Sequence, residues 1–72
     1  EGSIKKAIEY FSTAIKIKPE EIRNHYWLGR AYLKNKKRSL AKKEFNIVVS
    51  LSPRDKDDEI MQANAREVIQ SF

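Results

Sequence analysis

Few residues in this 72-residue chain could take part in catalysis or bind a metal, and the central one is His25, the only histidine. Glu21 precedes it by about one helical turn, but no third partner lies within reach in the sequence. A zinc site needs more ligands than this, and the chain has no cysteine. No nucleophilic side chain has an evident base. We therefore predict that the chain is not an enzyme and has no catalytic residue, metal or cofactor site.

An acidic run, Asp55-Lys56-Asp57-Asp58-Glu59, superficially resembles the start of a calcium-binding loop. It lacks the glycine that such a loop needs at the sixth position and the glutamate at the twelfth. Negative side chains are also favoured in the first turn of a helix, where the helix dipole is positive. We therefore interpret the run as the start of a helix, with Asp55 as its N-cap.

Basic residues outnumber acidic ones by 15 to 10, which gives a formal net charge of +5. Such a charge can attract acidic partners or RNA, because Lys and Arg neutralise phosphates. The densest basic group follows Lys34 and consists of Lys36, Lys37, Arg38, Lys42 and Lys43. It is either an anion-binding cluster or a solvated turn between helices, and we favour the turn because charged surfaces are common. Nucleic acid is not the favoured partner, since no RNA-binding aromatic signature is present.

The composition favours a small helical protein. Only two glycines and two prolines are present, which suits a few helices better than many strands. No apolar run approaches the ~20 residues that cross a membrane, so we expect no membrane partner. The lack of cysteine fits an intracellular, cytoplasmic protein. Because the chain opens Glu1-Gly2-Ser3 without methionine, we expect it to be a segment of a longer protein.

An internal repeat organises the chain. In residues 3–17, apolar side chains recur at steps of three and four, which predicts one face of a helix. The same patterning predicts helices over 19–34 and 38–50 and a fourth after residue 54. Sliding the sequence by 34 residues superposes residues of similar size. The pairs are Pro19 and Pro53, Ala7 and Ala41, Phe11 and Phe45, Ala14 and Val48, Ile15 and Val49, Ile17 and Leu51, Gly29 and Ala63, and Ala31 and Ala65.

The period and the residues resemble the tetratricopeptide repeat family, whose 34-residue unit is a helix–turn–helix. The matching motif positions are Leu28-Gly29, Tyr32, Ala41, Phe45, Val48 and Pro53. The resemblance implies an all-α fold, an α-solenoid of antiparallel helical hairpins with about four helices in one domain, residues 1–72. Residues 3–18 would be the second helix of a partial repeat and 19–53 a complete repeat. Residues 54–72 would be a further partial repeat or a capping helix.

In that family, the first helix of each hairpin lines a concave groove that binds a partner protein. The resemblance therefore implies a partner-binding groove formed by Arg23, Tyr26, Trp27, Arg30, Lys34, Ile60, Met61 and Asn64. We expect Trp27 to be exposed there, although it would be core if it had exchanged roles with His25. Some members bind a C-terminal carboxylate with a set of Lys, Asn and Arg residues. Trp27 stands where one basic residue of that set is needed, so we do not predict this type of site.

Both ends depart from the pattern. Gln62 and Arg66 replace an expected Leu and Tyr, which predicts that nothing packs beyond the last helix. We expect that helix to be a cap whose inward face is formed by Ile60, Met61, Ala63, Val68 and Ile69. The helix over 3–17 has no preceding partner, so we expect self-association, helix swapping or a place in a longer array.

These observations leave three hypotheses. The leading one is a protein–protein interaction module that binds a protein or peptide segment in a groove of a helical-repeat scaffold. The second is a structural segment that caps an array or makes it oligomerise. The third is a basic surface that binds RNA or an acidic partner, with an affinity that falls as the salt concentration rises.

Overall fold

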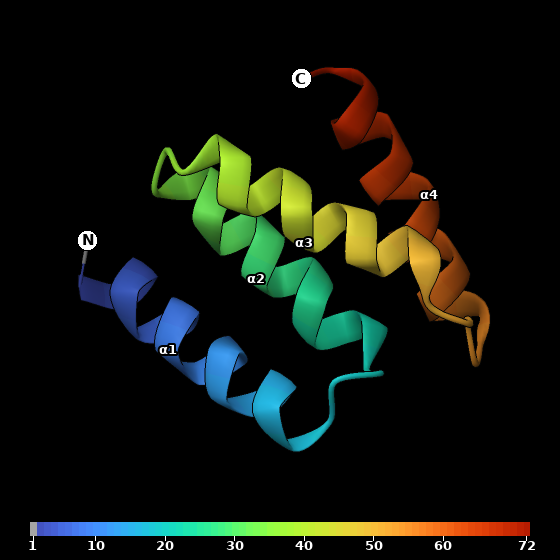
Figure 1. Ribbon diagram of the computed structural model, residues 1–72, viewed down its shortest axis with the longest axis horizontal. Helices are drawn as coiled ribbons and strands as arrows, with labels where there is room; N and C mark the ends of the chain where they lie inside the picture. The colour runs from blue at the N-terminus through green and yellow to red at the C-terminus, as the bar shows by residue number, and fades with distance from the viewer. Residues whose placement is uncertain (1) are drawn as a thin grey trace.

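The computed structural model describes residues 2–72 and contains four helices in that range: α1 (Gly2–Ile17), α2 (Ile22–Lys34), α3 (Arg38–Ser50) and α4 (Lys56–Gln70). Successive helices run antiparallel to one another (Figure 1). The helices α2 and α4 begin 34 residues apart, which is the offset at which the sequence matches itself. The predicted all-α arrangement of helical hairpins is thus confirmed.

The loops after α1 and α3 explain where the next helices begin. Pro19 and Pro53 both lie in these loops, as their matched positions require. The predicted helix start at Pro19 was wrong, because Pro19 and Glu20 form a turn and α2 begins at Ile22. The turn directs the carbonyl oxygen of Pro19 to the ring of His25, 2.7 Å away, whereas a helix would commit that oxygen to a backbone N–H.

The start of α4 agrees with the prediction. The side chain of Asp55 accepts a hydrogen bond from the backbone N–H of Asp58 at 2.9 Å, so Asp55 is the N-cap. Asp57, Asp58 and Glu59 occupy the first turn, where their charges stabilise the positive end of the helix dipole.

The core lies where α2 packs against α3 and α4. Among the described helices, α2 contacts all three others, whereas α1 contacts only α2. The largest side chains that are wholly buried are those of Phe45, Ile22 and Val48. The full core cluster is Ile22, Tyr26, Ala41, Phe45, Val48, Met61 and Ala65. No residue of α1 is fully buried, so α1 contributes little to this core.

A close approach between α2 and α3 centres on Gly29. A Cβ atom built on Gly29 would lie 2.9 Å from Cζ of Phe45, closer than real Cβ contacts. The Phe45 ring has an exposed fraction of 0%, so it has no free space to move into. The absence of a side chain at Gly29 therefore sets how closely these two helices pack.

The inward face of α4 differs in part from the prediction. Met61, Val68 and Ile69 pack on the core as expected, but Ile60 and Ala63 are exposed. Gln62, which we expected to face outward, is only 5% exposed. Its amide donates to the carbonyl oxygens of Val48 at 3.0 Å and Leu51 at 2.7 Å. These are acceptors at the end of α3 that the helix itself leaves unpaired, and the two hydrogen bonds satisfy both N–H groups of the buried amide nitrogen.

We expect Gly29→Ala to destabilise the fold. Alanine gains ~1 kcal/mol in helix propensity, but overpacking against a fixed ring typically costs about 1–3 kcal/mol. The free energy of unfolding, measured by urea denaturation followed by circular dichroism, should fall by about 1 kcal/mol, and further for Gly29→Val. Gly2→Ala is the control, because a Cβ there meets nothing within 4 Å. An unchanged or raised stability for Gly29→Ala would contradict the role of this contact.

Candidate partner-binding surface

One face of α2 presents a row of three cations and a tryptophan. Arg23, Trp27, Arg30 and Lys34 follow one another at steps of four, three and four residues, which places them on a single helix face. All four are exposed. This row contains most of the groove residues that the sequence predicted on α2.

Trp27 lies on the surface, and His25 takes the inward position. The indole is 43% exposed and contacts the ring of Tyr26 edge-on, with centroids 5.2 Å apart at an interplanar angle of 80°. The guanidinium of Arg30 lies 5.8 Å from the Trp27 centroid and 5.9 Å from that of Tyr26. At this range a cation is attracted to the face of an aromatic ring, so Arg30 helps to hold Trp27 in a defined orientation.

Tyr26 belongs to the core rather than to an open groove face. It is only 4% exposed and packs against Phe45, with ring centroids 5.9 Å apart. Its hydroxyl accepts from Nη1 of Arg30 at 3.2 Å, and Nδ2 of Asn64 lies 3.4 Å from the same oxygen. Tyr26, which we predicted to be among the groove residues, is thus mostly buried and holds Arg30 and Asn64 through its hydroxyl.

Two hollows open on either side of Trp27. The first lies between α1 and α2, has a volume of about 240 Å³ and is lined by Ser3, Ile4, Ala7, Phe11, Trp27, Arg30, Ala31 and Lys34. The second lies between α2 and α4, has a volume of about 310 Å³ and is lined by Arg23, Tyr26, Trp27, Asp57, Ile60, Met61 and Asn64. The structure thus brings all eight predicted groove residues to these two hollows, with Trp27 shared between them. Ile60 is exposed, whereas Met61 is buried at the base.

The first hollow is the more positive of the two. Arg30 and Lys34 line it, and no carboxylate is among its lining residues. In the second hollow, the carboxylate of Asp57 lies 3.9 Å from the guanidinium of Arg23, and both side chains are mostly exposed. Such a long, solvated ion pair contributes little and leaves Arg23 available for other contacts.

The basic cluster lies in the turn between α2 and α3 and on the outer side of α3. Lys36, Lys37, Arg38, Lys42 and Lys43 are all exposed. Among residues 2–72, no carboxylate forms an ion pair with them. The guanidinium of Arg38 lies 5.4 Å from the ring centroid of Phe72, and Lys36 lines a hollow with Lys5 and Lys34.

Lys36 has a structural role as well as a charge. Its φ of 60° places it in the left-handed region, immediately after the C-cap Asn35. The N–H of Lys37 donates to the carbonyl of Tyr32 at 2.9 Å and that of Lys36 to Leu33 at 3.0 Å. These two bonds form a Schellman motif that ends α2, in which glycine is the usual residue at the left-handed position.

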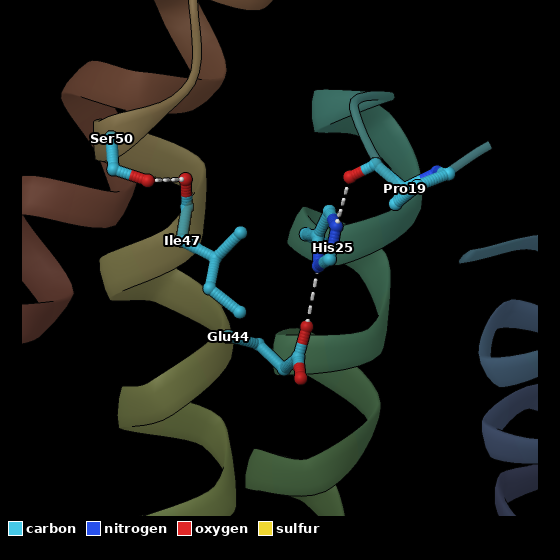
Figure 2. Close-up of polar contacts among 5 residues, drawn as sticks. All are labelled: Pro19, His25, Glu44, Ile47 and Ser50. Atoms are coloured by element: carbon cyan, nitrogen blue, oxygen red, sulfur yellow. Dashed lines mark hydrogen bonds and ion pairs between the residues drawn. The ribbon is translucent and has the colours of Figure 1, made fainter. Parts of the chain in front are cut away.

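The buried His25 side chain connects α2, α3 and the loop before α2 through hydrogen bonds (Figure 2). Its Nδ1 lies 2.7 Å from Oε1 of Glu44 on α3, and its Nε2 lies 2.7 Å from the carbonyl oxygen of Pro19 in the loop before α2. A carbonyl oxygen only accepts, so the partners assign a proton to Nε2. The His25 and Glu44 side chains are 6% and 14% exposed. The single histidine therefore holds the loop and α3 against α2.

No group of three or more His, Asp or Glu side chains within residues 2–72 is placed to hold a metal ion. Over the same range, no helix combines the length and the apolar character that crossing a bilayer demands.

A comparison with protein families decides the chain's relationship. The family described as regulator of microtubule dynamics protein 1-3, RMD1-3, matches residues 1–72, the whole chain. The chain belongs to the RMD1-3 family. No curated protein and no solved structure matches it with significant similarity.

The RMD1-3 match corrects the tetratricopeptide assignment, since it is this family and not a tetratricopeptide family that matches the chain. The residues behind that resemblance have a packing explanation. Gly29 must be small because the Phe45 ring lies against it, and Ala41 and Ala65 must be small because neighbouring helices bury them completely. Antiparallel hairpins repeated at this spacing need such residues, so the pattern indicates the helical arrangement rather than one family.

We expect Lys36→Gly to stabilise the fold. Glycine adopts the left-handed conformation without the steric cost that Lys36 bears, which for an L-residue is roughly 1–2 kcal/mol. Part of this gain is offset by the greater chain entropy of glycine in the unfolded state, so the net increase should be about 0.5–1 kcal/mol by urea denaturation. Lys37→Gly removes the same charge at a φ of −103°, and it should bring no increase. Equal effects of the two changes would show that charge, not backbone conformation, matters here.

We expect His25→Ala to cost about 2–4 kcal/mol of unfolding free energy, because it removes the partner of both the mostly buried Glu44 carboxylate and the Pro19 carbonyl. Glu44→Ala should cost less, since His25 would keep its bond to Pro19. In a double-mutant cycle with thermal or urea denaturation, the two changes should be non-additive by at least about 1 kcal/mol. Strict additivity would mean that the contact between the His25 ring and the Glu44 carboxylate does not stabilise the fold.

Proposed function

We propose that this chain is a protein-interaction module with a microtubule-related role, and that it binds a segment of a partner protein at the α2 face around Trp27. The family description, regulator of microtubule dynamics, supports the context. The observation that carries the binding surface is a half-exposed Trp27 flanked by Arg23 and Arg30 between two hollows.

The surface has the composition of a protein-binding site. Tryptophan, tyrosine and arginine are the residues most enriched among those that dominate binding energies. An exposed indole leaves apolar area in water, and covering it is favourable by about 25 cal/mol per Å². The cation–π contacts of Arg30 order the indole before binding, which lowers the entropy lost when a partner docks.

The proposal includes a binding rather than catalytic role inside the cell. His25, the single histidine, is committed on both ring nitrogens to structural contacts. A role connected with microtubules would be carried out in the cytoplasm. A protein partner suits the hollows beside Trp27, which combine apolar walls with flanking cations.

The test is co-sedimentation with assembled microtubules, together with binding to unassembled tubulin in case the partner is the subunit. Trp27→Ala should weaken binding about tenfold or more, as expected for a central aromatic anchor, with the helical circular dichroism unchanged. Arg30→Glu should weaken it as well, since it removes the cation that orders the indole.

Tyr10→Ala is the matched control, because Tyr10 is an exposed aromatic residue on α1 that lines neither hollow beside Trp27. An equal loss from Tyr10→Ala would show that the aromatic effect is not specific to the α2 face. Binding that survives both α2 changes but disappears on raising the salt concentration would move the site to the basic cluster. Unfolding by Trp27→Ala would make the residue structural, and Arg30→Glu would then decide the site.

A further inference from the structure

The internal repeat shows that α1 and α3 are equivalent helices with unequal surroundings. In the described chain, α3 packs against both α2 and α4, whereas α1 packs against α2 alone. Ala41 and Phe45 on α3 have exposed fractions of 0%. Their counterparts 34 residues earlier, Ala7 and Phe11, are only half-buried. The same residue types at matched positions thus differ in burial because α3 has two neighbouring helices among residues 2–72, whereas α1 has one.

The neighbour that makes the difference is α2. It lies between α3 and α4, with Gly29 against the Phe45 ring. The hollow between α1 and α2 is lined by the counterparts of the residues that α2 buries. Its walls include Ala7, Phe11, Trp27 and Ala31, which correspond to Ala41, Phe45, Met61 and Ala65.

We infer that this hollow is a seat for an amphipathic helix that carries acidic side chains and belongs to a partner protein. The inference rests on the proposed function, since it names the kind of segment that the Trp27 surface binds. The seated helix packs on α1 and α2 as α2 packs on α3 and α4, with a small residue opposite Phe11 where Gly29 stands opposite Phe45.

The hollow between α1 and α2 differs in charge from the matching site where α2 packs on α3 and α4, and this difference indicates the charge of the bound helix. Asn64, which contacts the hydroxyl of Tyr26, corresponds to Arg30, and Val68 corresponds to Lys34. A neutral donor and an apolar residue are therefore replaced by two cations, with no carboxylate lining the same hollow. An incoming helix meets Arg30 and Lys34 where α2 meets Asn64 and Val68, so acidic residues are favoured at the facing positions.

Charge also argues against a second copy as the occupant. The chain has a net charge of +5, and two copies would repel one another. The exposed side of α1 carries Lys5, Lys6 and Lys16 against Glu9. The α2 helix of a second copy is already packed between its own α3 and α4. These charges favour an acidic helix of a different protein over a second copy of this chain.

The experiment uses the tryptophan as its own reporter, because Trp27 is the only one in the chain. The probe is a peptide that copies residues 22–34 with Trp27→Ala, Tyr26→Glu and Leu33→Glu, held helical by an outward i,i+4 lactam bridge. Titrating it into the full chain should shift the Trp27 emission to shorter wavelength and saturate. A peptide with lysine at the two acidic positions, and one with leucine in place of Gly29, should each bind at least about tenfold more weakly.

The matched chain variants are Ala7→Leu, which blocks the seat, and Thr13→Leu, which adds the same side chain at an exposed position of α1. Only Ala7→Leu should abolish the shift, with circular dichroism showing that both remain helical. If Ala7→Leu unfolds the chain, the two control peptides still decide the outcome on the unaltered chain.

Several results would overturn the inference. Equal binding of the acidic and lysine peptides would remove the charge argument, and equal binding of the leucine peptide would remove the helix geometry. A concentration-dependent dimer abolished by Ala7→Leu would make a second copy the occupant. A longer natural form of the chain would be measured in the same way. If its Trp27 emission is already shifted and it does not bind the peptide, a segment of the chain itself occupies the hollow. Peptide binding that is absent while microtubule binding depends on Trp27 would refute the seat and leave the proposed function standing.

Discussion

The contact between Gly29 and the Phe45 ring fixes the position of α2, and the rest of the structure depends on that position. Because no side chain separates the two, α2 lies close to α3 and completes the burial of Phe45 and Ala41. From there α2 also reaches α4 and α1, which makes it the one helix in contact with all the others described. A helix in this position must serve two purposes, since one side builds the core while the other remains on the surface.

The division between these two sides falls within a few residues. His25 and Tyr26 are buried and form hydrogen bonds to Glu44 and Arg30, whereas Trp27 and Arg30 are exposed. The hydroxyl of Tyr26 connects the sides, because it is held in the core yet accepts from Arg30. Arg30 is thereby oriented by the core, so its position beside Trp27 is formed before a partner binds.

Much of the fold could be predicted from the sequence, because helix periodicity depends on side-chain polarity and the 34-residue offset on side-chain size. The span of α3 and the N-cap Asp55 agree with the structure. The errors concern polar groups whose partners lie far along the chain. Gln62 was expected outside, yet it binds carbonyls of Val48 and Leu51, and Glu44 was not singled out because nothing local pairs it with His25. The start of α2 was missed for the same reason, since the Pro19 carbonyl serves His25.

The candidate surface was predictable as a row of residues on one helix face, but its division into two hollows was not. That division requires knowing how α1 and α4 lie beside α2, and the sequence does not contain their relative placement in any local pattern. Tyr26 illustrates the limit, because its ring packs on Phe45, a residue of another helix.

Among residues 2–72, α1 has one neighbouring helix, and this has a consequence for how the molecule opens. A helix with no fully buried residue can separate from α2 without exposing the central cluster, so α1 forms a cooperative unit of lower stability than the other three. Backbone amides in α1 would then exchange with solvent through this partial opening, while those of α2 and α3 exchange only when the whole chain unfolds. Any molecule that contacts both α1 and α2 would disfavour their separation, and its affinity would be reduced by the free energy needed to order the N-terminal helix.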